Sequence, residues 1–210
     1  MKTLLDLENW NRKEHFAHFK QMEEPFFGVT VEIDCTKAYQ TAKELNVSFF
    51  IYYLHKTLAA VNSVENFKYR IADDKIYIND RIDASATIGR EDGTFGFSLI
   101  EYHPDFNLFK QNALTEIERI QNTSGLFTRS FDDDNLIHFS AIPWINFTSI
   151  SHARSYTFPD SCPKISFGKM TTSETGKRII PMSVHVHHAL MDGLHVGKFI
   201  DRFEEEMNKK

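Results

Sequence analysis

Residues 179–208 read IIPMSVHVHHALMDGLHVGKFIDRFEEEMN and combine a strand, a sharp turn and a helix. Apolar and polar residues alternate from Ile179 to His187, which is typical of a β-strand. Asp192 and Gly193 then predict a turn, with Asp192 at or near the N-cap of the helix that follows. The apolar residues of that helix recur at helical spacing and predict its inward face: Val196, Phe199, Ile200, Phe203 and Met207.

Similar patterns extend through the rest of the chain. They predict helices over residues 9–22, 36–45, 49–62 and 104–122, and strands over residues 26–33, 67–71, 75–78, 83–90, 94–102, 136–142, 145–151 and 166–171. Helices and strands are interspersed, and short turns join several strands. We therefore expect an α+β fold in which helices pack on a mixed sheet, within a single domain over residues 1–210.

Composition narrows the class of protein. The chain has 210 residues, a net charge of −5 and 13% aromatic residues, which fit a globular core and give no basic excess for nucleic-acid binding. The longest apolar stretch, Phe49 to Leu54, is too short to span a membrane, and no secretory signal follows Met1. Two cysteines, Cys35 and Cys162, fit a reducing compartment, so we expect a cytoplasmic protein.

Histidines gather at the end of the last strand. His185 and His187 project from one face of a strand, which suits a hydrogen-bonded or solvated pair, or two ligands of a zinc site that lacks an evident third ligand. His188 is different, because it ends an apolar strand face beside a sharp turn. There it is either a core histidine or a positioned base whose burial keeps the ring neutral.

Three segments resemble one family of enzymes and follow one another in that family's order. HHALMDGLH, from His187, is similar to the HHxxxDGxH signature of the trimeric chloramphenicol acetyltransferases. WNRKEHF, from Trp10, is similar to the WxRxEHF block of this family, and SAIPW, from Ser140, is similar to its SAxPW segment. HxxxDG alone is also found in dihydrolipoyl acyltransferase cores and condensation domains, so this motif by itself does not distinguish the families. The three blocks together do, and they cover nearly the whole chain.

The resemblance implies roles for the histidine and its neighbours. His188 stands where the family has its catalytic general base. Asp192 is implied to pair with Arg12, and this pair holds the catalytic loop rather than relaying protons. The implied fold is a two-layer sandwich like that of other CoA-dependent acyltransferases.

Other roles are implied for residues on earlier strands. Ser140 is implied to donate to the oxyanion of the tetrahedral intermediate. In PKISFGK, from Pro163, Ser166 takes the place of a family threonine that aids this intermediate through water, and Lys169 is a candidate contact for CoA phosphates. Attack of an alcohol on a thioester needs both a base and an oxyanion donor, so these types of residue suit direct acetyl transfer.

The acceptor pocket departs from the pattern of the family. The resemblance implies a pocket that contains Phe19, Glu23, Phe27, Phe95 and Phe97. Glu23 stands about where an apolar residue is usual, and Phe97 about where a small residue is usual. A carboxylate and a larger ring would reshape the pocket, so chloramphenicol is implied as acceptor but a different one stays open.

The resemblance therefore implies a homotrimeric acetyltransferase that uses acetyl-CoA as co-substrate, with sites at subunit interfaces and a role in antibiotic resistance. We expect no metal, no nucleic acid and no membrane partner. Two alternatives remain: acetyl transfer to another hydroxyl or amine, and a non-catalytic homologue that binds a ligand. A histidine-based metal protein is a further rival.

Overall fold

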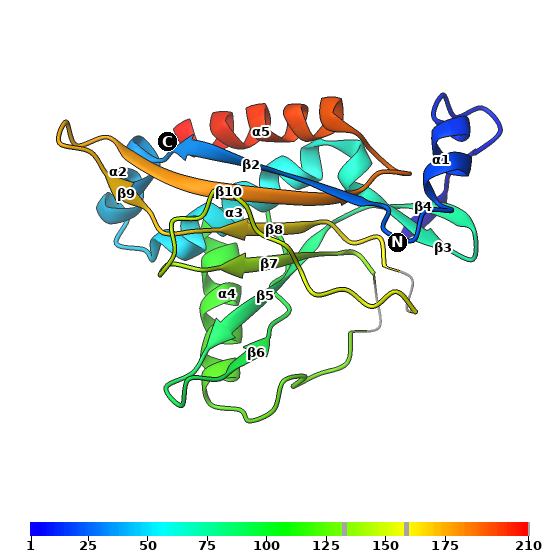
Figure 1. The fold of residues 1–210 in the computed structure, drawn as a ribbon. Helices are drawn as coiled ribbons and strands as arrows, with labels where there is room; N and C mark the ends of the chain where they lie inside the picture. Colours follow the sequence, from blue (N-terminus) through cyan, green and yellow to red (C-terminus); the bar gives the residue numbers. More distant parts are fainter. Residues whose placement is uncertain (132–133, 158–159, 210) are drawn as a thin grey trace.

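The last strand organises the main sheet of the computed structural model, which describes residues 1–131, 134–157 and 160–209. β10 (Arg178–His187) pairs antiparallel with β2 (Phe26–Asp34) on one side and with β8 (Lys164–Phe167) on the other. The sheet continues through β7 (Leu136–Ala141), β5 (Asp83–Gly89) and β6 (Phe95–Phe97), while the short β9 (Thr171–Thr172) pairs with the start of β10. β7 runs parallel to both β8 and β5, so the sheet is mixed, as predicted (Figure 1).

Helices cover the apolar face of this sheet. The helical layer contains α2 (Thr36–Glu44), α3 (Phe49–Ser63), α4 (Phe106–Gln121) and α5 (Gly193–Asn208). α3 is buried over most of its length and packs against the other three helices, while α5 presents Val196, Phe199 and Phe203 inward. Figure 1 shows α5 running along β2 and β10. The prediction of an α+β fold with helices packed on a mixed sheet is confirmed.

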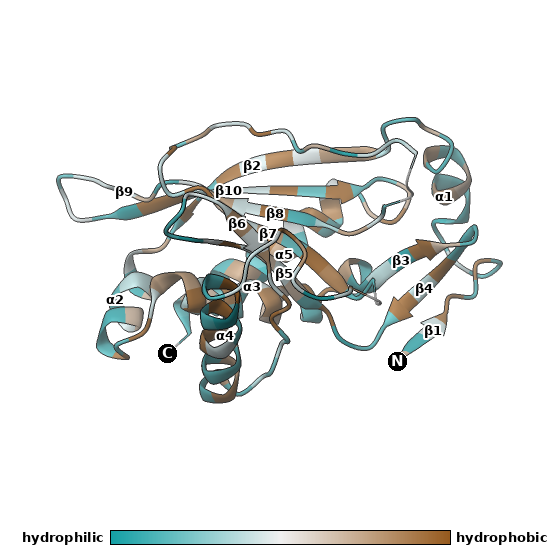
Figure 2. Cartoon of the chain, turned by 90° about the horizontal axis from the view of Figure 1, so that it is seen from below, coloured by the Kyte–Doolittle hydropathy of each residue, from teal (hydrophilic) through white to brown (hydrophobic). Residues whose placement is uncertain are grey.

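The opposite face of the sheet is polar. Because side chains alternate along a strand, Ser183, His185 and His187 leave β10 on the side away from Val184 and Val186. Neighbouring strands continue the pattern, since His185 is opposite Lys164 and Lys164 is opposite His138. Figure 2 shows this alternation as changes of colour along β10 and its neighbours.

A second, smaller sheet lies at one end of the molecule. It has the order β1 (Lys2–Leu4), β4 (Lys75–Asn79) and β3 (Tyr69–Ala72), and a 3₁₀ turn, η1 (Glu65–Lys68), leads into β3. α1 (Lys13–Phe19) lies at the same end (Figures 1 and 2). Phe16 anchors α1 in the core, and the start of β2 lies beside it.

Several predicted elements differ from the structure. Residues 145–151 are not a strand, because the chain turns at Pro143 and leaves the sheet, with Trp144 and Ile145 exposed. The first helix is shorter than predicted, and the strand predicted over residues 94–102 is regular only in β6. β1 was not predicted, since its three residues are all exposed and carry no apolar pattern. Among the described helices, none is long and apolar enough to cross a membrane.

Candidate active site

His188 lies just beyond the end of β10, between two aromatic side chains. Its ring stacks on Phe19 of α1, with centroids 3.8 Å apart and planes 11° apart, and Phe27 of β2 lies at 4.7 Å. The main-chain N–H of His188 donates to the carbonyl of Pro25 at 2.8 Å, which ties the turn to the start of β2. Nδ1 is buried without a hydrogen-bond partner among the described residues. The ring is therefore held by packing, while the residue as a whole is only half-buried.

An ion pair fixes the backbone of this turn. Arg12 Nη1 donates to Asp192 Oδ2, and Arg12 Nη2 donates to the carbonyl oxygen of His188 at 3.4 Å. The Arg12 side chain is 8% exposed, so its charge depends on Asp192 for neutralisation. Burial by itself raises the pKa of Asp192, but the hydrogen bonds from Arg12 and His195 outweigh it and hold this pKa at about 2. The implied pairing of Arg12 with Asp192 is present in the structure.

Replacing Asp192 with alanine should lower both stability and activity. The change leaves the buried Arg12 guanidinium unpaired and removes the N-cap of α5, which together should cost about 3 kcal/mol or more of unfolding free energy. Urea unfolding checks this, with Asp201→Ala as the control because Asp201 is exposed on the same helix. Unchanged stability with lost activity would instead make Asp192 a direct participant in the reaction.

Ser140 and Ser166 form a second group in another part of the sheet. They are opposite each other on the parallel strands β7 and β8, so their side chains share the polar face. Ser166 is fully buried, and its hydroxyl has no hydrogen-bond partner among the described residues. Lys169 follows β8, is exposed, and donates its main-chain N–H to the carbonyl of Ile145 at 2.7 Å.

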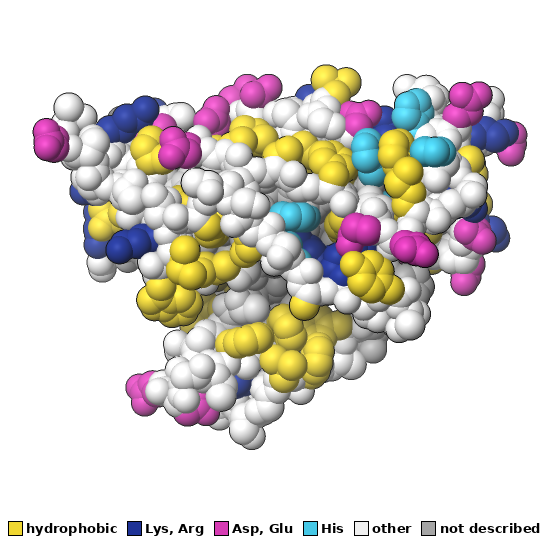
Figure 3. Space-filling view, viewed as in Figure 1, with side chains coloured by type: hydrophobic (Ala, Val, Ile, Leu, Met, Phe, Trp, Pro, Cys, Tyr) yellow, Lys and Arg dark blue, Asp and Glu magenta, His cyan; other side chains and the backbone are white. Residues whose placement is uncertain are grey.

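The residues predicted to line the acceptor pocket fall into both groups. Phe19 and Phe27 contact His188, and Glu23 is exposed in the connection between α1 and β2. Phe95 and Phe97 lie on β6, four strands from β10 in the sheet order. Phe97 is opposite Thr87 of β5, and its ring lies 5.2 Å from that of Phe127. Figure 3 shows hydrophobic side chains gathered near β6, in a different part of this face from the histidines near α1.

One chain does not bring these two groups together. Ser140 is opposite Ser166, and Ser166 is opposite Ser183 of β10. His188 lies five positions after Ser183, so roughly 15 Å along the strands and roughly 10 Å across them separate it from Ser140. We call the residues around His188 (Arg12, Phe19, Phe27, His188 and Asp192) the histidine half-site, and those around Ser140 (Phe95, Phe97, Ser140, Ser166 and Lys169) the serine half-site.

A separate polar cluster lies on the open face of the sheet. A cavity of about 200 Å³ is lined by His152, His185, Lys164 and Arg154, among others, and His188 is not part of it. Arg154 pairs with Glu24 and lies over the ring of Phe26. The rings of His152 and His185 meet edge to face with centroids 4.8 Å apart. Each cation in this cavity has a carboxylate partner, since Lys164 pairs with Asp160.

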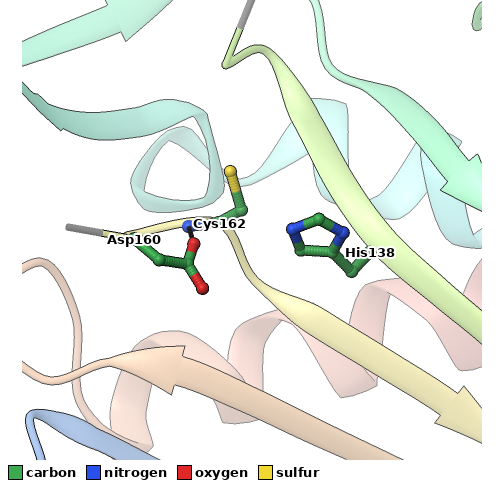
Figure 4. Close-up of side chains that lie close together, drawn as sticks. All are labelled: His138, Asp160 and Cys162. Atoms are coloured by element: carbon green, nitrogen blue, oxygen red, sulfur yellow. Dashed lines mark hydrogen bonds between the residues drawn. The ribbon is translucent and has the colours of Figure 1, made fainter. Parts of the chain in front are cut away.

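His138, Asp160 and Cys162 adjoin this cluster (Figure 4). Their possible metal-ligand atoms lie within 4.8 Å of one another. Asp160 is already held, because the Lys164 ammonium pairs with it and the Cys162 N–H donates to it at 2.8 Å. Burial raises the pKa of the Cys162 thiol. His138 is exposed at its surface, but desolvation by the surrounding protein and the Lys164 charge lower its pKa to about 4. The group is thus built as an ion-pair network around Lys164.

His187 ends β10 on the polar face but is buried, at 6% exposure. Its Nδ1 accepts from the N–H of Ala189 at 3.3 Å, and its ring meets Phe26 edge to face. Burial, reinforced by the Arg154 charge, lowers its pKa to about 4. Of the two settings expected for His187, the structure therefore shows the hydrogen-bonded one and not the solvated one.

Stability should fall as the pH drops from about 6.5 to about 4. The ordinary pKa of a histidine is 6.5 and the pKa of His187 in the folded protein is about 4, so the unfolded chain binds the proton first. Protonation of His187 should lower the unfolding free energy by about 3 kcal/mol once the pH is below about 4. Above pH 6.5 this residue should cause no loss of stability. Urea unfolding across this range checks it: His187→Gln should flatten the profile, whereas the exposed His15→Gln should not. An equal slope in both variants would contradict the assignment.

Sequence reasoning did not assign roles to His195, His138 or His152. His195 pairs with Asp192, as an acidic N-cap followed three residues later by a side-chain partner could have indicated. On β7, His138 and Ser140 alternate with apolar residues. This alternation could have indicated that His138 lies on the open, polar face of the sheet. His152 directly follows residues 145–151, which were predicted, wrongly, to be a strand, and no pattern marked it.

The family model described as chloramphenicol acetyltransferase matches residues 1–204. Chloramphenicol acetyltransferase 3 of Escherichia coli is 31% identical over 209 residues, which cover 99% of this chain and 98% of that one. A chloramphenicol acetyltransferase of Bacillus pumilus is 28% identical and covers 92% of this chain and 88% of its own length.

Solved structures show the same fold. A structure described as chloramphenicol acetyltransferase has a TM-score of 0.91 at 33% identity and covers 99% of this chain and 100% of that one. A dihydrolipoamide acetyltransferase from Azotobacter vinelandii has a TM-score of 0.66 at 11% identity, covering 93% of this chain and 86% of its own. At that identity the likeness concerns the fold alone.

Proposed function

The chain belongs to the chloramphenicol acetyltransferase family, and from that premise we propose that it transfers the acetyl group of acetyl-CoA to a hydroxyl of chloramphenicol. The observation that carries the proposal is the setting of His188. Its ring is packed between two phenylalanines, and its backbone is clamped by the pair of Arg12 and Asp192. A rigidly held imidazole beside an apolar surface suits proton transfer to and from a bound small molecule.

His188 acts as the general base in this proposal. Of its two ring nitrogens, Nδ1 is buried, which leaves Nε2 as the atom that an acceptor can reach. Nε2 takes the proton of the acceptor hydroxyl as that oxygen forms its bond to the thioester carbonyl carbon. When the carbon–sulfur bond breaks, His188 returns the proton to the departing thiolate. Such acid–base assistance is worth about 10²–10⁴-fold in rate.

Ser140 supplies the donor for the oxyanion. Its Oγ–H would donate to the carbonyl oxygen as negative charge develops there, which is worth about 10²–10³-fold. Ser166 supports the same intermediate, and its buried hydroxyl without a partner is consistent with a ligand or water there. Lys169 is exposed at the same end of the sheet, where its ammonium suits the phosphates of CoA.

The two half-sites would meet across a subunit interface. The base and the oxyanion donor must both lie within hydrogen-bond reach of one substrate, whereas one chain keeps them far apart. We infer a cyclic homotrimer in which the histidine half-site of one subunit faces the serine half-site of the next. Exposed apolar side chains beside the serine half-site, including Phe127 at 68%, support burial of this region.

A second acceptor class is favoured by the pocket residues. Glu23 is exposed and makes no hydrogen bond or ion pair within the described part of the chain, and Phe97 adds a ring to the serine half-site. A carboxylate without a partner can accept a hydrogen bond from a polar acceptor. A hydroxyl compound more polar than chloramphenicol is therefore the second candidate.

One assay tests the function and compares the acceptors. Release of the CoA thiol from acetyl-CoA is followed with a thiol reagent, first with chloramphenicol and then with a panel of hydroxyl compounds. The proposal expects thiol release that depends on chloramphenicol, with acetylated chloramphenicol as product. Release with another hydroxyl compound alone would favour the second candidate, and no release with any acceptor would favour a non-catalytic homologue.

A further inference from the structure

His195 contacts Asp192 through a single nitrogen. Its Nδ1 lies 2.8 Å from Asp192 Oδ1 and 3.2 Å from the main-chain nitrogen of Asp192. Asp192 Oδ1 also accepts the N–H of Leu194 at 3.0 Å, while Oδ2 accepts from Arg12. His195 is only 14% exposed on its side chain, so water does not compete freely for these contacts. His195 is thus the side-chain partner of the carboxylate on the side away from Arg12.

The two contacts of Nδ1 require opposite states of that atom. The main-chain N–H of Asp192 needs a lone pair on Nδ1, whereas the carboxylate oxygen needs a proton on it. At 2.8 Å a lone pair facing a carboxylate oxygen would be repelled, and the carboxylate contact is the shorter of the two. The geometry therefore places the proton on Nδ1, directed at Oδ1.

We propose that His195 is a positioning residue: its Nδ1–H holds the Asp192 carboxylate in the orientation that lets Arg12 clamp the backbone of His188. The connection runs from His195 to Asp192 Oδ1, from Asp192 Oδ2 to Arg12 Nη1, and from Arg12 Nη2 to the His188 carbonyl. This inference rests on the proposed role of His188 as base. Without this donor, only the Leu194 N–H holds Oδ1, so the carboxylate can shift relative to Arg12 and the backbone of His188 is held less firmly.

The surroundings of His195 keep it a neutral donor. Burial lowers its pKa, Asp192 raises it, and the charges of Arg12 and Lys198 lower it further, with a net downward shift. The remaining proton at neutral pH therefore stays on Nδ1, beside the carboxylate. The role proposed for His195 is accordingly that of a hydrogen-bond donor and not of a second cation next to Arg12.

Replacing His195 with glutamine or with glutamate distinguishes its role as hydrogen-bond donor to Asp192 from its role in capping the helix. His195→Gln keeps a donor for Asp192 Oδ1 and an acceptor for the Asp192 N–H. His195→Glu keeps only the acceptor, which is the usual partner in a capping box and suits a helix N-terminus. Its carboxylate faces that of Asp192 with like charge. If His195 served only to cap the helix, the two variants should therefore have similar kcat, or the glutamate variant the higher one.

The variants are assayed with acetyl-CoA and chloramphenicol, alongside His188→Ala and thermal unfolding of each. His195→Gln should keep at least about a third of kcat, whereas His195→Glu should lose about 10- to 100-fold through misplacement of the base. The KM for acetyl-CoA should stay about the same, because the change concerns the base and not the serine half-site. Equal kcat for the two variants, with His188→Ala inactive, would overturn this inference alone.

Two further outcomes are decisive. If His188→Ala keeps wild-type kcat, the proposed role of His188 as base fails and this inference fails with it. If His195→Glu does not fold, His195→Met replaces it, since methionine donates no hydrogen bond. The inference then expects Gln to exceed Met at least about tenfold in kcat. Similar values for Gln and Met would overturn it.

Discussion

His188→Ala is expected to reduce acetyl transfer by at least about 10²–10⁴-fold while the protein stays folded. The change removes the proton acceptor, but the main-chain contacts of residue 188 with Pro25 and Arg12 do not depend on the side chain. The thiol-release assay measures the loss, and circular dichroism with gel filtration checks folding and assembly. Loss of the ring also leaves Phe19 without its stacking partner, so a modest fall in melting temperature is expected.

His185→Ala is the matched control for this variant. His185 lies on β10, three residues before His188, is half-buried and points to the polar cavity rather than to Phe19. Its replacement should leave kcat within a few-fold of the wild type, since no proposed step uses it. Wild-type rates in His188→Ala, or an equal loss in His185→Ala, would contradict the assignment of the base.

Mixing two inactive variants should restore activity. If each site takes its base from one subunit and its oxyanion donor from the next, a His188→Ala subunit still supplies Ser140, and a Ser140→Ala subunit still supplies His188. Random assembly of equal amounts should make about a quarter of all sites complete, and about a third of the sites in trimers that contain both variants. Each variant alone should be far less active, by about 10²–10³-fold for the loss of Ser140.

Co-expression of the two variants with different tags, followed by purification through both tags, gives the mixed oligomers. Mixtures of His188→Ala with the double variant His188→Ala/Ser140→Ala serve as the control, because none of their sites can be complete. Activity in the first mixture and none in the second would establish a site shared between subunits. No recovery of activity in either mixture would mean that each subunit holds its own complete site. That result would contradict the shared site inferred from the separation of Ser140 and His188 within one chain.

Local sequence patterns predicted the helix that begins at Gly193 and the strand that ends at His187 with little error. Those elements have long apolar periodicities and clear ends, so short-range information suffices. The same reasoning failed at residues 145–151, where apolar residues also alternate. A strand needs a neighbour to pair with, and the turn at Pro143 takes this segment away from the sheet.

The sequence by itself determined the fold class, the family and the types of residue in both half-sites. It could do so because hydrophobic periodicity and short motifs are local features of a chain. Only the tertiary structure decided which of those residues meet. Arg12 reaches Asp192 across 180 positions, whereas Ser140 and His188 remain apart although their strands belong to one sheet. The register of β10 against β8 and β7 sets that separation, and register depends on long-range pairing that no local pattern of residues specifies.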